Sequence, residues 1–275
     1  MATPKTSSMV APHPDCYGFA SSNSTKSNVR KAALATTEEV QKIRVKYLDV
    51  DQVYTSFADA LAALPQNSTP ATILLESNVS LAFDKGSYFT VESERNVTID
   101  LNGFVLSSKQ DLTANSQLIL NKGTLTIKDN STDDPAKWGK ITNLSLAPSQ
   151  HLNEEGKLRP PYGNYTINNR GTLTLNSGII ESASAGAACY AVEMEQGAHA
   201  VSFTMNDGIV RHILGSTAIR IYPTSSSSED KKISMVINGG TIQTNDYETA
   251  PAKEGFIFSV QMGSSLKPYV SVTIN

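Results

Sequence analysis

The chain has little net charge, no long apolar run and no apolar leader. Over 275 residues the formal net charge is −3, so bulk charge gives no reason to expect nucleic acid or an anionic membrane as a partner. No apolar run approaches the roughly 20 residues that a membrane-spanning helix needs. The first residues lack the apolar centre of a secretion signal. We therefore expect no nucleic acid and no membrane span, and either use without export or a leader removed upstream of Met1.

Cysteine is scarce, which excludes a disulfide framework. The chain has two, Cys16 and Cys189, and we expect both to be free and Cys189 to be buried as a small apolar group. Cys16 has His13 nearby, but one Cys-His pair lacks the four ligands of a zinc site. The sequence therefore predicts no metal centre in this region and no cofactor.

What the sequence does contain is a repeat. Residues 165–242 carry three copies of a short alternating strand, an Asn-x-Gly corner and a second short strand. The corner residues Asn176, Asn206 and Asn238 are 30 and 32 residues apart. Such spacing is typical of repeat architectures in which the units stack. Asparagine suits these corners because it tolerates positive φ and its amide can bond to the asparagine of the next unit.

Each repeated strand has one apolar face. Leucine, isoleucine, valine, phenylalanine and methionine alternate with threonine, serine or asparagine, which is the period of a half-buried strand. Strands that recur in this way can lie above one another, about 4.8 Å apart, in a parallel ladder. We expect Leu175, Met205 and Ile237 to form one column inside a narrow core.

A second family of strands precedes the first in each repeat. Its expected members are Gln117–Leu120, Tyr165–Asn168, Tyr190–Glu195, Ala218–Tyr222 and Gly255–Val260. About six turns of chain result. The combination of GTLT strands and T-[ILM]-N corners resembles the right-handed parallel β-helix of the pectate-lyase-like superfamily over residues 70–275. The resemblance implies an all-β solenoid and says little about chemistry.

The N-terminal part has a different composition. Residues 1–35 are rich in Ser, Thr, Asn and Pro and cannot bury enough surface to fold alone, so we expect them to need a partner. A capping box at residues 36–39 precedes Val40, Ile43 and Tyr47. These three lie at helical spacing and predict a short helix whose apolar stripe docks on the shaft or on another copy.

Residues 30–41 carry a second resemblance. Their A-T-x-E-E-V pattern is similar to the linkers of bacteriophage head and tail fibres, which join an anchoring N-terminus to a distal β-rich shaft; an ordinary capped helix is the other interpretation. The resemblance implies an anchoring arm over residues 1–50, a β-helix over 51–275, and a trimer held through Val40, Ile43 and Tyr47.

A second helix is expected at residues 56–64. Phe57, Leu61 and Leu64 share one helical face, and Pro65 ends the helix. The first turn of a β-helix exposes its apolar interior and a strand edge, which an amphipathic helix can cover. We therefore expect residues 56–64 to cap the shaft.

The repeat is interrupted at residues 129–164, where we expect an inserted loop. Insertions in solenoids often carry the binding surface, and sugar rings stack on exposed aromatic side chains. Our candidates for glycan contact are Trp138, His151 and Tyr162 in this loop, together with Tyr222. Alternatively, Trp138 packs the loop onto the shaft.

Acidic residues of the same loop raise the question of calcium. Asp129, Asp133 and Asp134 carry suitable ligands, but their spacing matches no known calcium loop, so we predict no metal site.

The catalytic alternative rests on Glu193 and Glu195, which share a strand face as a glycosidase or lyase pair would. Aligning the strands, however, places Arg220 beside Glu193 and Arg211 beside Glu181, an arrangement that a solvated face uses for ion pairs. We interpret both pairs as structural and predict no catalytic residue.

The sequence thus favours a non-enzymatic binding protein. Our first hypothesis is a phage virion appendage, a head or tail fibre attached through residues 1–50 and contacting host surface polysaccharide. The second is a bacterial cell-surface adhesin domain, and the third is a polysaccharide lyase or hydrolase.

Overall fold

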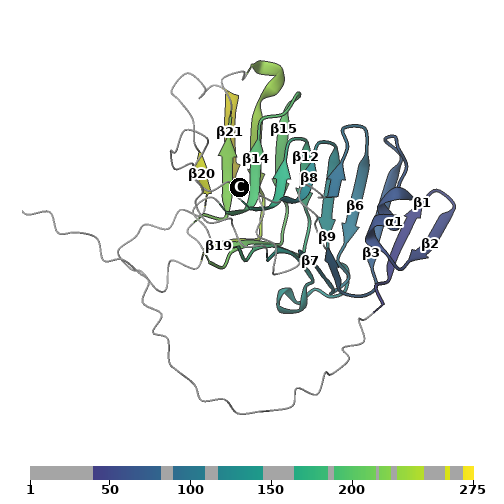
Figure 1. Cartoon of the computed structure of the whole chain (residues 1–275). Helices are drawn as coiled ribbons and strands as arrows, with labels where there is room; N and C mark the ends of the chain where they lie inside the picture. The colour runs from purple at the N-terminus through teal and green to yellow at the C-terminus, as the bar shows by residue number, and fades with distance from the viewer. Residues whose placement is uncertain are drawn as a thin grey trace, which may run out of the picture. The chain divides into compact units, whose positions relative to one another are not determined.

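The described part of the chain is an all-β structure, as expected. The computed structural model describes residues 40–81, 89–108, 117–144, 164–184, 189–214, 217–223, 228–244, 258–260 and 269–275. All of them belong to one compact unit, Glu39–Asn275. Its described strands form one sheet of nine strands and two sheets of six, here named sheets A, B and C (Figure 1).

The strands of each sheet come from all along the unit. In spatial order, sheet A contains β2 (Val50–Tyr54), β1 (Ile43–Tyr47), β3 (Pro70–Leu75), β6 (Asn96–Asp100), β9 (Thr124–Lys128), β12 (Thr172–Leu175), β15 (Val201–Met205), β18 (Ile233–Ile237) and β21 (Val270–Ile274). Sheet B contains β19 (Thr241–Thr244), β16 (Ile209–His212), β13 (Ile179–Ser182), β10 (Lys140–Asn143), β7 (Val105–Ser108) and β4 (Val79–Leu81). Sheet C contains β20 (Phe258–Val260), β17 (Ile219–Tyr222), β14 (Tyr190–Glu195), β11 (Tyr165–Asn169), β8 (Gln117–Asn121) and β5 (Phe89–Val91).

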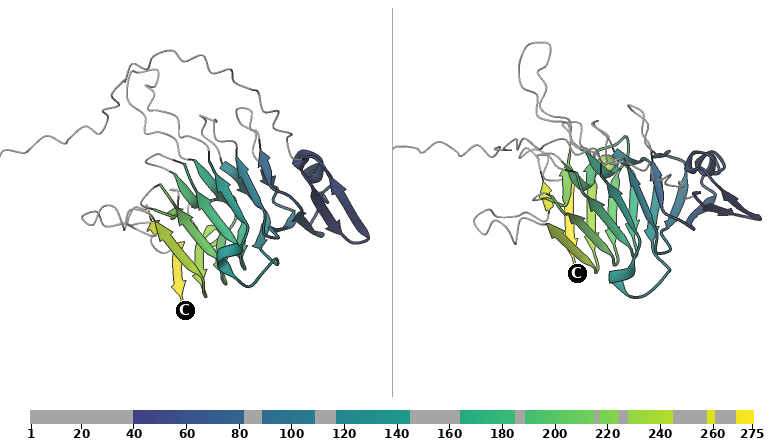
Figure 2. Two further views of the ribbon diagram at one scale, coloured as in Figure 1. Left: turned by 90° about the horizontal axis from the view of Figure 1, so that it is seen from below. Right: turned by 60° about the horizontal axis from the view of Figure 1, so that its bottom comes forward.

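From β3 onward the chain visits sheets A, B and C in turn. Each strand therefore pairs with the strand three places later, and all of these pairs are parallel. Figure 2 shows the result, with strands lying side by side in an order that follows the colour from purple to yellow. Both predicted strand families are present, as sheet A and sheet C.

The interior is one column of apolar side chains, as the alternation predicted. Leu175 pairs with Met205, and Met205 pairs with Ile237, in consecutive strands of sheet A. All three are buried in the same hydrophobic cluster, to which strands of sheets B and C also contribute. The repeat period therefore matches the return of the chain to sheet A at every third strand, with one core shared by the three sheets.

The Asn-x-Gly corners bond to one another as expected. The amide of Asn206 donates to Asn176 at 2.8 Å, that of Asn238 donates to Asn206 at 2.8 Å, and that of Asn275 donates to Asn238 at 2.6 Å. The corner glycines have positive φ, and a Cβ at Gly208 would lie 2.9 Å from the carbonyl oxygen of Gly178. Glycine is therefore required both for the turn and for the close approach of the neighbouring turn.

The predicted helix with a stripe of Val40, Ile43 and Tyr47 is wrong. Residues 43–47 form strand β1, which pairs antiparallel with β2 and with β3. Ile43 and Val45 are fully buried while Arg44 and Lys46 point outward, so the period of two prevails over the helical spacing. Residues 1–39, including the capping box, lie outside the described residues.

The predicted helix at 56–64 is confirmed as α1 (Phe57–Ala62), with Ser56 as its N-cap. The ring of Phe57 meets that of Phe89 edge-on, with centroids 5.7 Å apart. The helix thus covers the apolar interior, but the edge of sheet A is covered by the hairpin of β1 and β2. The expectation that the helix covers the strand edge as well needs this correction.

The predicted insertion at 129–164 is not one continuous loop, because a regular strand interrupts it. Residues 140–143 form β10, which pairs with β7 and β13 as a regular member of sheet B. The described part of the predicted insertion that precedes this strand is residues 129–139, which connect β9 to β10 and contain the 3-10 turn η1 (Pro135–Lys137). The motif K-I-T-N carries one large apolar residue, Ile141, which is too little alternation to identify a strand from sequence.

Candidate functional site

The outer surface of sheet C carries a cluster of aromatic and charged side chains. On β11, β14 and β17 the residues Ile167, Val192 and Ile219 point into the core. Arg220 contacts Glu193 and the rings of Tyr190 and Tyr222, and Tyr190 stacks on Tyr165. We call this group, with Asn168 beside Glu193, the tyrosine-glutamate face: Tyr165, Asn168, Tyr190, Glu193, Arg220 and Tyr222. Parallel pairing at this register brings together residues 25 to 57 positions apart in the sequence.

Aromatic rings form one part of this face. The rings of Tyr165 and Tyr190 stack with centroids 5.9 Å apart and planes 9° from parallel. The guanidinium carbon of Arg220 lies 4.3 Å from the ring centroid of Tyr222 and 5.4 Å from that of Tyr190. Such cation-π contacts fix both partners. Tyr222, which is 38% exposed, presents its ring to solvent.

Glu193 lies beneath these rings. Its Oε1 accepts a hydrogen bond of 3.3 Å from Nη1 of Arg220, which confirms the expected pairing. The expectation of a solvated face is wrong, because Glu193 is 2% exposed. Burial raises the pKa of Glu193 to about 7, although Arg220 and the hydroxyl group of Tyr165 both lower it. One arginine does not compensate for the loss of hydration.

The second carboxylate of this strand is held by other partners. Glu195 accepts hydrogen bonds of 2.7 Å from Nη2 of Arg170 and 2.9 Å from Nδ2 of Asn168. A glycosidase pair needs two carboxylates open to one groove. Because Glu193 is buried and Glu195 is engaged, the geometry favours a structural role for both.

The other predicted ion pair, on sheet B, is also confirmed. Glu181 is 1% exposed and accepts from Nζ of Lys140 at 2.7 Å, from Nε of Arg211 at 2.7 Å and from the hydroxyl group of Thr142 at 3.0 Å. Burial alone would raise the pKa of Glu181, but the hydrogen bonds from Lys140 and Arg211 outweigh it, and the pKa is lowered. This carboxylate is a fully bonded part of the scaffold.

Trp138 does not belong to the strands that carry the tyrosine-glutamate face. It follows η1, is partly exposed, and its indole Nε1 donates to the carbonyl oxygen of Thr132 at 2.9 Å. This bond joins two parts of the excursion 129–139 to each other, and the alternative, that Trp138 packs the loop onto the shaft, stays a prediction. Of the other two candidates in the predicted loop, His151 and Tyr162 lie outside the described residues.

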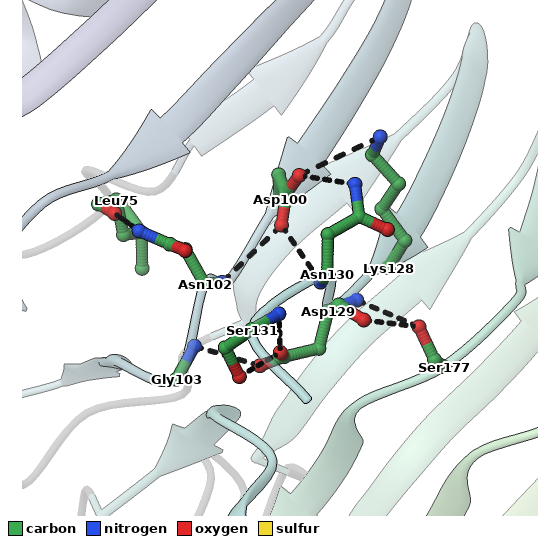
Figure 3. Close-up of polar contacts among 9 residues, drawn as sticks. All are labelled: Leu75, Asp100, Asn102, Gly103, Lys128, Asp129, Asn130, Ser131 and Ser177. Carbon is green, nitrogen blue, oxygen red and sulfur yellow. Dashed lines mark hydrogen bonds and ion pairs between the residues drawn. The ribbon is translucent and has the colours of Figure 1, made fainter. Parts of the chain in front are cut away.

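Two aspartates anchor the ends of this excursion (Figure 3). Asp129 is 4% exposed and accepts from the backbone N–H groups of Gly103 and Gly139 at 2.9 and 2.6 Å. Asp100 accepts from the backbone N–H of Asn102 and of Asn130, both at 3.2 Å. These oxygens serve the corner itself. Among the residues that the structure describes, no three His, Cys, Asp or Glu side chains come together as metal ligands.

The three residues expected to anchor the chain to other copies have different environments. Val40 is 62% exposed, Ile43 is fully buried in the core of its own chain, and Tyr47 packs partly against that core. Without the predicted helix they form no single stripe.

Sequence reasoning missed Tyr165, Tyr190, Asn168 and Arg170. Asn168 could have been found, because it alternates with the inward-facing Ile167 on its strand. Tyr165 and Tyr190 could not, because each lies two residues before a core residue, Ile167 or Val192, and a strict period of two would turn them inward. The stacking of Tyr165 on Tyr190 was not predictable, because the number of residues between paired strands of sheet C varies along the chain.

Comparisons with known proteins do not identify the chain. No family model matches it, and no curated protein or solved structure matches it either. None of the described helices is long and apolar enough to cross a membrane.

Proposed function

We propose that the chain is a right-handed parallel β-helix of the pectate-lyase-like kind, acting as a non-enzymatic binding protein for surface polysaccharide. The rotation of the chain through three sheets, parallel pairing at every third strand and one shared core support this fold. The tyrosine-glutamate face is the proposed contact with the sugar.

The observation that carries this proposal is the exposed ring of Tyr222 held by Arg220. The guanidinium group of Arg220 lies over one face of the Tyr222 ring, 4.3 Å from its centroid, and holds the ring in place, so the opposite face is the platform proposed for the sugar. Sugar rings present both an apolar C–H face and hydroxyl groups, so they suit such a surface. The neighbouring Tyr165 and Tyr190 extend the same side of the sheet.

The arrangement favours binding over cleavage. General acid catalysis requires a side chain within hydrogen-bonding reach of the substrate. Glu193 is 2% exposed, and the carboxylate of Glu195 is bonded to Arg170 and Asn168. Neither carboxylate of the pair expected of a lyase or hydrolase is therefore available to a substrate.

We infer that the biological setting is a phage virion, with residues 1–50 attaching a trimer and the β-helix directed at host polysaccharide. The similarity of residues 30–41 to fibre linkers supports this setting. A bacterial cell-surface adhesin is the alternative, and the same glycan-binding face serves it.

The test is binding of the full chain to immobilised bacterial surface polysaccharides, measured by surface plasmon resonance. Tyr222→Ala is expected to weaken binding at least tenfold, whereas Tyr222→Phe, which keeps the ring, retains it. Val53→Ala is a matched control. Val53 is an exposed apolar residue, 39% exposed, on β2 at the edge of sheet A, whereas Tyr222 belongs to β17 in sheet C.

Trp138→Ala tests whether Trp138, the other described aromatic candidate, contributes to glycan binding. Unchanged binding in this variant agrees with the tyrosine-glutamate face as the site. Wild-type affinity in Tyr222→Ala contradicts the proposed site, and release of shortened glycan by the wild-type chain contradicts a purely binding role.

A further inference from the structure

Two neighbouring side chains on the tyrosine-glutamate face each bury an oxygen atom that has no hydrogen-bond donor. They are Oε2 of Glu193 and Oδ1 of Asn168. Both residues are 2% exposed, and the register pairs them on the adjacent strands β14 and β11. Paired side chains on one face of a ladder are direct neighbours. Two acceptors thus share a region that water does not reach.

The orientation of the Asn168 amide is fixed by its surroundings. Its Nδ2 donates to Oε1 of Gln117 at 2.8 Å and to Oε2 of Glu195 at 2.9 Å. Exchanging the amide oxygen and nitrogen would direct the oxygen at the Glu195 carboxylate. Asn168 therefore cannot supply the missing donor by turning over.

A proton resolves both deficits. An ionised carboxylate only accepts hydrogen bonds, whereas a protonated one also donates one. Leaving two buried acceptors unpaired costs free energy, and ionising a buried carboxyl group adds to this cost. A proton on Oε2 of Glu193 converts one of the two acceptors into the donor that the other lacks.

We propose that Glu193 is held as a neutral carboxylic acid in the folded protein below neutral pH, with its proton donated to Oδ1 of Asn168. The proton comes from solvent, so folding of this face takes up one proton in the pH range where Glu193 is ionised in the unfolded chain and protonated in the folded one, between about 4.5 and 7. No other bond forms or breaks.

The charged groups around Glu193 act in both directions. Arg220 on β17 donates to Oε1, and Arg170 lies beyond Glu195; both favour the ionised form. Tyr165 on β11 lowers the pKa of Glu193 through its hydroxyl group, and the negative charge of Glu195 raises it. Burial is the largest influence, and the pKa of Glu193 is about 7 as a result.

The first test is the pH dependence of unfolding in Glu193→Gln. Glutamine places an N–H where the proposed acid places its O–H, so it can donate to Asn168 without titrating. A pKa raised from 4.5 to about 7 means that the stabilisation is complete below pH 4.5 and is lost as pH rises through 7. Relative to Glu193→Gln, the wild-type folding constant should fall roughly tenfold per pH unit across this window and level off above it.

The second test observes the acid itself. The infrared spectrum of the folded wild type at pH 6 should contain the C=O band of a protonated carboxylic acid, shifted in D₂O and absent from Glu193→Gln. Glu181→Gln is the matched control, because it removes another buried glutamate and should leave both the band and the fall in folding constant unchanged. Absence of the band at pH 6, or equal pH profiles for wild type and Glu193→Gln, overturns the proposal; if that variant fails to fold, the band in the wild type decides.

Discussion

Glu181 on sheet B and Glu193 on sheet C occupy equivalent positions with opposite consequences. Each side chain is 2% exposed, and each faces an arginine on the next strand of its sheet. The pKa of Glu181 nevertheless lies below its ordinary value, and that of Glu193 is raised to about 7. Burial and an arginine partner therefore do not decide the ionisation of a buried carboxyl group by themselves.

The number and quality of donors make the difference. Glu181 lies between Thr142 and Arg211 in the ladder and is reached by Lys140 as well, so both of its oxygens are bonded. Glu193 lies between Asn168 and Arg220, and its hydrogen bond to the arginine is 3.3 Å long. Close, charge-assisted bonds compensate for lost hydration only when they satisfy the whole carboxylate.

The largest effect is expected for Glu181→Gln. The substitution removes the negative charge and replaces one of the two acceptor oxygens by an NH2 group, which then faces the donors of Lys140, Thr142 or Arg211. The two cations, about one third exposed, can still reach water. We expect a loss of about 3 kcal/mol in the free energy of unfolding at pH 7, measured with urea. A loss below about 1 kcal/mol would show that the bonds to Glu181 contribute little.

The same variant has a characteristic pH dependence. Because the pKa of Glu181 is lowered on folding, its contribution is present above the unfolded value of 4.5 and is lost as pH falls through the folded value. The unfolding free energies of wild type and Glu181→Gln should therefore converge in acid. A gap that stays constant down to the acid limit would contradict the assignment.

An intermediate effect is expected for Arg220→Met. Arg220 favours the ionised form of Glu193, so its removal should cost more where Glu193 is ionised. We expect the loss in unfolding free energy to be about 1 kcal/mol greater at pH 8 than at pH 5. Equal losses at the two pH values would mean that Arg220 acts only through packing against Tyr190 and Tyr222.

The smallest effect is expected for Tyr165→Phe, which removes the hydroxyl group that lowers the pKa of Glu193. We expect a loss of about 0.5 to 1 kcal/mol at pH 8 and less at pH 5. Tyr190→Phe is the matched control, because Tyr190 stacks on Tyr165. The pKa of Glu193 is lowered by a hydrogen bond from Tyr165 and not by one from Tyr190. The same loss in both variants would assign the effect to the stacked rings.

Much of the architecture was predictable because local and long-range signals agree in the repeat. The alternation around Leu175, Met205 and Ile237 and the spacing of the corner asparagines point to the same register, and the structure has that register. The ion pairs of Glu181 and Glu193 followed from it. Their opposite pKa shifts did not, because these depend on donors contributed by other strands.

The N-terminal hairpin was not predictable for a related reason. The segment I-R-V-K-Y satisfies a strand period through Ile43 and Val45, while Val40, Ile43 and Tyr47 satisfy a helical one. Pairing with β3 decides between the two, and that contact lies about 30 residues further along the chain. Tertiary context overrides local preference at such positions.

The pairing of each strand with the strand three places later also bears on how this molecule can change in length. Among the described strands from β6 to β18, each one lies between the strand three places earlier and the strand three places later. Loss or duplication of three consecutive strands, one from each sheet, therefore leaves neighbouring strands that can pair again, and each sheet becomes one strand narrower or wider around the same kind of core. A gain or loss of a single residue within a strand has no such remedy, because it turns every later side chain of that strand to the opposite side.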